Sequence, residues 1–254
     1  MGGVCREEAL MHTFYLERRA AVGETVALPK DEAKHALKVL RLSVGDEVCA
    51  LDGCGGRYSA VLERAGSDAA EVRLTGELSP NEPPVRVTLY QGLPKADKLD
   101  FIVQKLTELG ASGVVPVKME RCVVKSDAKD GQKRQERLER IAFEAVKQCR
   151  RACSPAIAEP MAWKQAQMRL QKHDLVLVPW EDAQGYNLKK AFADAPEARD
   201  VGIVVGPEGG MSEGEVEALR AQGARIVTLG PRILRAETAA VAAVTMAMTL
   251  WGDL

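Results

Sequence analysis

Two glycine–proline loops in the last fifty residues carry the residue types best suited to holding a ligand. Residues 206–210 read Gly-Pro-Glu-Gly-Gly, and residues 230–238 read Gly-Pro-Arg-Ile-Leu-Arg-Ala-Glu-Thr. Glycine lets backbone N–H and C=O groups approach a ligand closely, and the proline that follows stiffens the bend. Neither loop has the glycine spacing of a dinucleotide or P-loop site, so a phosphate cradle is not the first interpretation.

Each loop follows a predicted strand and precedes a predicted helix. The β-branched segments 201–205 and 225–229 are the strands, and Ser212 with Glu215 forms a capping box just after the first loop. Ligands in an open α/β sheet bind outside the carboxyl ends of its strands. We therefore expect the two loops to border one site.

The remainder of the second half also alternates strand and helix. Predicted strands cover 85–91, 113–117 and 175–178, and predicted helices cover 97–109 and 133–149. This alternation is typical of a parallel sheet with helices on both faces.

The last predicted helix, residues 236–251, is apolar nearly all round. A helix without a polar face must be covered on every side. We predict that a second subunit covers this helix in a homodimer. The alternative is burial of the helix inside one large domain.

A proline-rich segment, residues 78–84, divides the chain. Upstream of it, one helix is predicted over 31–42 with Asp31 as N-cap, among short strands at 12–16, 25–28, 47–51, 57–63 and 71–78. The pattern indicates a small β-barrel over residues 12–80 and a second domain over 81–254. Residues 1–11 form a leader that is either disordered or an upstream extension.

Composition excludes several classes of protein. A net charge of −1 argues against a globally basic nucleic-acid binder, although residues 118–151 hold 11 basic and 6 acidic side chains. On charge alone, a solvated helix face is the favoured explanation of that excess. Six cysteines without a CxxC pair, and no export signal or long apolar run, predict a cytoplasmic protein with reduced thiols, no metal and no membrane span.

Together these motifs resemble the RsmE-type 16S rRNA (uracil-N3)-methyltransferases of the SPOUT superfamily, and the likeness extends over residues 14–254. The matching residues are 205–215 and 229–239, 95–100, 104–110, Glu144, Gln148, Arg151 and Pro155, and, in the first half, His35 and 39–41. One departure is the absence of an arginine just before Phe14. Either His12 or the pair Arg18 and Arg19 is expected to replace it.

The resemblance implies a PUA-like RNA-docking barrel over residues 12–80 and a SPOUT domain over 81–254. In that domain a mostly parallel sheet with helices on both faces is tied into a trefoil knot, an exception to the usual rule against knots. It further implies a homodimer that binds S-adenosyl-L-methionine in the knot loops. The implied reaction is methyl transfer to N3 of one uridine in the 16S rRNA of the small ribosomal subunit.

The adenine of such a cofactor suits a narrow slot of apolar side chains and open backbone groups. The predicted cofactor residues are Leu229, Gly230, Ile233 and Leu234 on one wall, Gly206, Val178 and Pro179 on the other, and Thr238 and Ala239 on the last helix. Ordinary core packing is the alternative interpretation of Ile233 and Leu234.

Uracil N3 bears a proton and is a poor nucleophile until that proton leaves. Arg235 is predicted to stabilise the negative charge that then develops on the base. Glu208 is predicted to orient the base or to accept the proton, and Glu237 either does the same or holds Arg235. Stabilisation of a helix start by an acidic side chain is the alternative role of both carboxylates.

Basic side chains on both domains are predicted to meet RNA phosphates, with solvated surface as the alternative. They are Arg18, Arg19, Arg41, Lys95, Lys98, Arg121, Arg150 and Arg151. Two other functions stay open at this point. One is a cofactor-free RNA-binding assembly factor, and the other is a SPOUT enzyme that modifies another RNA position or tRNA.

Overall fold

The computed structural model describes residues 11–95, 97–123 and 128–254. The predicted leader therefore lies outside the described residues, apart from Met11. The chain forms two compact units, which are described separately. The first contains the chain up to Glu82 together with Val146–Ser154, and the second contains Pro83–Ala145 and Pro155–Leu254.

The first unit is built on a five-stranded sheet in the order β1-β3-β4-β5-β2, in which only β1 and β3 run parallel. The long pair β4·β5 alternates buried and exposed residues, which gives the sheet one apolar face. Phe14, Leu62 and Leu74 are among the core residues on that face. The strands are β1 (Thr13–Tyr15), β2 (Thr25–Ala27), β3 (Glu47–Leu51), β4 (Arg57–Ala65) and β5 (Ala70–Glu77).

The single helix predicted over residues 31–42 is two short pieces. A turn of α-helix, α1 (Lys30–Lys34), continues into the π-helix η2 (His35–Val39). Pro29, not Asp31, is the N-cap, and Asp31 lies in the first turn. Just beyond η2, Arg41 has a φ of 56°, a left-handed conformation that is uncommon outside glycine.

A distant segment of chain completes the first unit. The Tyr15 hydroxyl shares its one proton between the carbonyl oxygens of Val146 and Arg151, which lie 3.0 and 2.7 Å away. Arg151 is 5% exposed, and its guanidinium donates to Glu82 at 2.7 Å. Residues 146–154 therefore belong with the small sheet, although they lie far from it in sequence.

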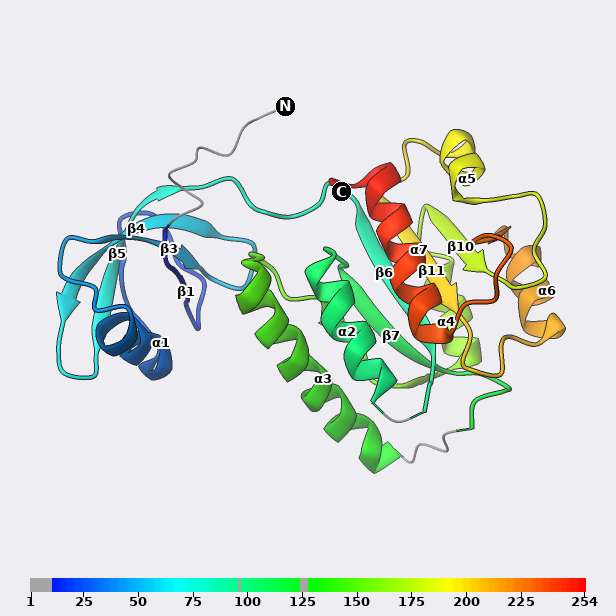
Figure 1. The fold of residues 1–254 in the computed structure, drawn as a ribbon, viewed down its shortest axis with the longest axis horizontal. Helices are drawn as coiled ribbons and strands as arrows, with labels where there is room; N and C mark the ends of the chain where they lie inside the picture. The colour runs from blue at the N-terminus through cyan, green and yellow to red at the C-terminus, as the bar shows by residue number, and fades with distance from the viewer. Residues whose placement is uncertain (1–10, 96, 124–127) are drawn as a thin grey trace. The chain divides into compact units, whose positions relative to one another are not determined.

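The second unit contains a seven-stranded sheet in which every pairing is parallel (Figure 1). Its order is β12-β10-β11-β6-β7-β8, and β9 pairs with β7. The strands are β6 (Arg86–Gly92), β7 (Gly113–Lys118), β8 (Ala156–Ile157), β9 (Met161–Ala162), β10 (Leu175–Pro179), β11 (Asp200–Val205) and β12 (Arg225–Val227).

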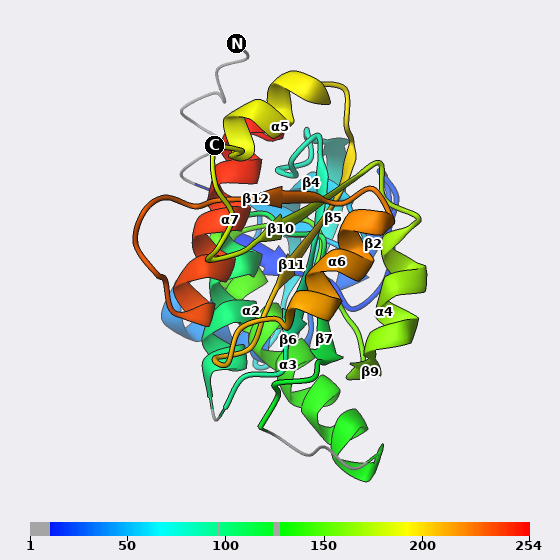
Figure 2. The same cartoon turned by 90° about the vertical axis from the view of Figure 1, so that its right-hand side faces the viewer.

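Helices cover both faces of this sheet, as predicted, and Figure 2 shows α2 and α7 on one side and α4 and α6 on the other. The first face carries α2 (Lys98–Glu108), part of α3 (Ala128–Cys149), α5 (Leu188–Asp194) and α7 (Ala236–Trp251). The second carries α4 (Trp163–Leu170) and α6 (Glu213–Ala221). The sequence patterns do not predict the helices α4 and α5 or the two-residue strands β8 and β9.

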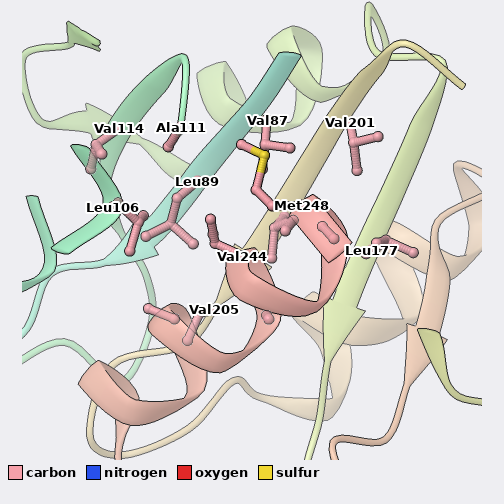
Figure 3. Close-up of a cluster of buried hydrophobic side chains, with 14 of the residues drawn as sticks. Val87, Leu89, Leu106, Ala111, Val114, Leu177, Val201, Val205, Val244 and Met248 are labelled. Carbon is pink, nitrogen blue, oxygen red and sulfur yellow. The ribbon is translucent and has the colours of Figure 1, made fainter. Parts of the chain in front are cut away.

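The last helix lies over the centre of the sheet. Val244 and Met248 pack on Val87, Leu89 and Val201 (Figure 3). Its seven buried residues recur every three or four positions and make a single stripe, which is the face that the sheet covers. Away from that stripe, Met246 is 38% exposed. The fold therefore covers one side of α7 and leaves apolar side chains on another.

Candidate active site

The two glycine–proline loops border one pocket of about 850 Å³. We call residues 206–210 loop 1 and residues 230–235 loop 2. Loop 1 follows β11 and loop 2 follows β12, and β10 lies between these two strands in the sheet. Because parallel strands all end at the same edge, both loops and the chain after β10 meet there. Both loops therefore line one pocket at this edge of the sheet.

Most of the predicted cofactor residues lie at this pocket. Its lining includes Pro179, Gly206, Leu229, Gly230, Ile233, Leu234 and Ala239. Two predicted residues are not part of the lining. Val178 is completely buried in the core beneath the sheet with Tyr90 and Val204, because successive residues of a strand point to opposite faces. Thr238 is an exposed residue of the first turn of α7.

Several lining residues were not predicted. Trp180, Glu181, Gln184 and Gly185 come from the segment after β10, and Met211 follows loop 1. The signal for the first group was present, since they directly follow the predicted strand 175–178 and strand ends border the site. This segment lacks the glycine–proline pair that identifies loops 1 and 2 in the sequence.

Loop 1 is fastened to the sheet by a buried amide. The Gln91 side chain is fully buried at the end of β6, and its Nε2 donates to the carbonyl oxygens of Gly92 and Gly206, both at 3.0 Å. A Cβ atom at Gly92 would lie 2.5 Å from Cδ of Pro207. The loop is thus packed directly against the neighbouring strand, at a place where only glycine fits.

The far end of loop 1 is held by the capping box, which the structure confirms. The carboxylate of Glu215 accepts from the backbone N–H of Ser212 at 3.0 Å and from that of Glu120 at 2.9 Å. Glu215 is only 6% exposed. Its two oxygens therefore join the start of α6 to the segment after β7.

Loop 2 is more open. Its contacts with the chain include a short turn in which the Gly230 N–H donates to Oγ1 of Thr228 at 3.1 Å, and Gly230 has a φ of 116°. Ile233 is 88% exposed, and the Arg235 side chain is also exposed. Arg235 is the N-cap of α7 with an extended backbone. In Figure 2 the chain bulges outward between β12 and α7.

A cluster of charges stands at the same pocket. The ammonium of Lys98 lies 3.1 Å from Oε1 of Glu208 and 3.2 Å from Oε2 of Glu237. The backbone N–H of Lys95 also donates to Glu208, at 2.9 Å. This cluster joins the chain before α2 and its first turn to loop 1 and to the first turn of α7.

These contacts decide the protonation of the carboxylates. Burial alone would raise the pKa of Glu208, but the Lys95 N–H and the Lys98 ammonium outweigh it and lower that pKa below the usual 4.5. Burial opposes ionisation of Glu237 too, but its own backbone N–H and the cations of Lys98 and Arg235 bring its pKa below 4.5. The same partners raise the pKa of Lys98, chiefly through Glu208. All three side chains are therefore charged at neutral pH.

The predicted RNA-binding residues fall into three groups. Arg18, Arg19, Arg41 and Arg150 are exposed on the first unit, and Lys95 and Arg121 are exposed on the second. Lys98 lines the pocket instead. Arg151 does not fit the predicted role, because it is buried and paired with Glu82. Arg150 and Arg151 also belong to the first unit, not to the large domain in which the sequence places them.

The described residues contain neither a membrane-spanning helix nor a metal-binding cluster. Their helices are all too short or too polar to cross a bilayer. Across residues 11–95, 97–123 and 128–254, no group of three or more His, Cys, Asp or Glu side chains is arranged to hold a metal ion.

Comparison with known proteins gives matches over both units. The RNA methyltransferase domain model matches residues 81–248, and the RNA methyltransferase PUA domain model matches residues 28–75. The ribosomal RNA small subunit methyltransferase E of Bacillus subtilis (strain 168) is 35% identical over 237 residues, covering 90% of this chain and 93% of that protein. The protein of the same name from Aquifex aeolicus (strain VF5) is 32% identical, with 94% and 99% covered.

A solved structure is similar over nearly the whole chain. It is the crystal structure of a ribosomal RNA small subunit methyltransferase E from Neisseria gonorrhoeae bound to S-adenosyl methionine. It is 33% identical with a TM-score of 0.80, and the alignment covers 96% of this chain and 99% of that one. With matches of this extent in both units, the chain belongs to the ribosomal RNA small subunit methyltransferase E family, the RsmE-type enzymes that its motifs resemble.

Proposed function

We propose that this protein is an S-adenosyl-L-methionine-dependent enzyme that methylates N3 of a specific uridine in 16S rRNA. The observation that carries the proposal is the pocket in which both glycine–proline loops meet Lys98, Glu208 and Arg235. A family relative with this architecture is described as bound to S-adenosyl methionine. A bacterial enzyme with this substrate works in the cytoplasm.

The lining of the pocket fits the cofactor. Leu229, Ile233 and Leu234 supply apolar surface for an adenine ring, and the exposure of Ile233 leaves that surface open to a ligand. Gly206 and Gly230 bring backbone groups to the same pocket without a side chain in the way. When bound, the cofactor supplies the methyl group.

The charged residues divide the remaining work. Arg235 presents a cation at the pocket, and this cation stabilises negative charge on the base as N3 loses its proton. Glu208 has a lowered pKa and therefore accepts protons weakly. Of the two roles predicted for Glu208, orienting the base fits better than accepting its proton. Glu237 pairs with Lys98, and the Arg235 cation is also close enough to help lower the pKa of Glu237.

RNA docking is assigned to residues 12–80 and methyl transfer to residues 81–254. Arg18, Arg19, Arg41 and Arg150 offer exposed cations on the first unit. Structured RNA is recognised through its phosphates and through bases splayed out of a helix, so the target uridine is turned out of its stack into the pocket.

Two further features belong to the proposal. The chain returns from the edge strand β12 to α7, which packs on β6 and β11. Such a return path is required for threading into a trefoil knot.

A homodimer is supported by the exposed apolar side of α7, which includes Met246. Phe101 of the adjacent helix α2 is exposed too. Sedimentation velocity of the full chain tests the dimer, and a monomer at micromolar concentration would refute it.

The activity is tested in a bacterial strain that lacks its own enzyme of this family. Nucleosides from its 16S rRNA are analysed by mass spectrometry with and without a plasmid that expresses this chain. We expect N3-methyluridine to return with the plasmid. Its absence, together with a new methylated nucleoside elsewhere in 16S rRNA or in tRNA, would redirect the specificity.

Calorimetry separates an enzyme from an assembly factor of the same fold. The full chain is titrated with S-adenosyl-L-methionine, and we expect a saturable heat of binding. An absence of heat at millimolar cofactor would favour a cofactor-free RNA-binding role.

A further inference from the structure

Lys98 has a surrounding that differs from that of an ordinary surface lysine. It lies in the first turn of α2, its side chain is 31% exposed, and it is one of the residues that line the pocket. Its ammonium contacts two carboxylates from two other segments, Glu208 of loop 1 and Glu237 of α7. The sequence interpretation as a contact for RNA phosphates does not account for this position.

The charges near the pocket balance only when Lys98 is counted. Three carboxylates and two guanidinium groups stand there besides Lys98: Glu181, Glu208, Glu237, Arg232 and Arg235. Without Lys98 this group would carry a net charge of −1. Loss of the N3 proton makes the target base an anion, which a net negative site would repel. Lys98 therefore removes an electrostatic obstacle to the proposed reaction.

The ammonium also has a donor to spare. Lysine has three N–H donors, and the ion pairs with Glu208 and Glu237 can engage at most two of them. Among the residues that the structure describes, no third acceptor is recorded for Lys98. Because Lys98 lines the pocket, that donor is available to whatever occupies it.

We propose that Lys98 is a further catalytic residue, whose third N–H donates to a carbonyl oxygen of the target uracil. This inference rests on the proposed function. The proton leaves N3 for water, and the electron pair left behind is shared between N3 and its two flanking carbonyl oxygens. A cation bound to one of these oxygens stabilises the anion more than the neutral base, and so favours the form of N3 that accepts the methyl group.

The same helix provides a matched control. Lys105 lies two turns after Lys98, its side chain is 35% exposed, and it pairs with Glu108 at 2.8 Å. It is absent from the lining of the pocket. Lys105→Met removes the same charge from α2 without touching the site.

The test uses the full chain and two RNAs. One is 16S rRNA transcribed with ordinary uridine, and the other is transcribed with 5-fluorouridine, whose electron-withdrawing fluorine makes N3–H more acidic. Single-turnover rates are measured for the wild type, Lys98→Met, Lys98→Arg and Lys105→Met across a range of pH. Cofactor affinity is measured by calorimetry for each protein.

We expect Lys98→Met to slow transfer to uridine by roughly 100-fold, the order found for the loss of one such donor. The defect should shrink by about tenfold or more on 5-fluorouridine, because a more acidic base needs less help from a cation. The rate of Lys98→Met on uridine should also keep rising at pH values where the wild type has levelled off. Lys98→Arg should recover part of the rate, and Lys105→Met should match the wild type.

Two outcomes would overturn the inference. The first is an equal loss on both RNAs with an unchanged pH profile, which would make Lys98 a purely structural link between the loops. The second is a loss explained by weaker cofactor binding. A wild type that forms no N3-methyluridine in ordinary RNA would instead refute the proposed function, so the two failures are distinguishable.

Discussion

Loops 1 and 2 begin with the same glycine–proline pair and follow strands of the same sheet, yet the structure treats them differently. Loop 1 is fastened by Gln91, by the capping box of Glu215 and by the ammonium of Lys98. Loop 2 has a short turn at Gly230 and then exposes Ile233 and Arg235.

The comparison separates two ways of building a binding site. In loop 1 the side chains around it fix the backbone in place, so the backbone itself is available as a rigid surface. In loop 2 the backbone is less restrained, and its exposed side chains are available to a ligand. A site needs both, because rigid groups reduce the entropy lost on binding and exposed groups supply the contacts.

The largest expected effect comes from a side chain of loop 2. Arg235→Ala should lower kcat by about 10²–10³-fold, as the loss of a charge-stabilising donor commonly does, with little change in cofactor affinity. Steady-state kinetics together with calorimetry measures both quantities. Parallel losses of kcat and cofactor affinity would reassign Arg235 to cofactor binding.

A pair of glycine variants tests how each backbone is held. Gly92→Ala places a methyl group against Pro207, and overpacking of this kind costs about 1–3 kcal/mol or more. It should therefore lower both the thermal midpoint and cofactor affinity.

Gly230→Ala meets no atom within 4 Å and carries only the strain of a positive φ, about 1–2 kcal/mol. It should be the milder change in a thermal unfolding assay. If Gly230→Ala proved the more damaging of the two, loop 2 would be the more rigid loop and the comparison would be reversed.

The capping box offers a smaller test on loop 1 alone. Glu215→Ala leaves the backbone N–H groups of Ser212 and Glu120 without their acceptor, which costs about 1–3 kcal/mol in a buried setting. Glu217→Ala is the control, since Glu217 is an exposed residue of the same helix paired with Arg220. Urea unfolding should separate the two variants, and equal midpoints would show that Glu215 does not fasten the loop.

The smallest effect is a dependence of stability on pH. Glu208 and Glu237 have pKa values below 4.5 in the folded protein, so their contribution is complete above that value and is lost as pH falls through the folded pKa values. Lys98→Met should flatten this loss when unfolding midpoints are compared between about pH 6 and about pH 3.5. An identical slope in the variant would show that Lys98 does not set these pKa values.

Local patterns predicted most elements of the fold. The β-branched runs and the apolar periodicity locate β10, β11, α2 and α7, because strand and helix periods are visible in short windows of sequence. Short elements such as α5 and β9 are not predicted, because so few residues cannot show the apolar periodicity of a helix or a strand. The π-helix at His35–Val39 is not predicted because its sequence also suits an ordinary α-helix.

The candidate site was predicted in part. Glycine and proline mark loops 1 and 2 in any context, and the rule for parallel sheets brings their strand ends together. The sequence does not predict which charged side chains form ion pairs with one another. Lys98 and Arg151 look alike in sequence, but one stands at the pocket between two carboxylates and the other is buried against Glu82.

The sequence by itself determined the longer strands and helices, the two loops and the family, because these depend on residue types at short spacing. Only the tertiary structure decided which loop is held firmly and which charges meet. Those properties depend on contacts such as Gln91 with Gly206 and Lys98 with Glu237, which join residues more than a hundred positions apart. No local pattern encodes such a contact, since it exists only once packing has placed both partners.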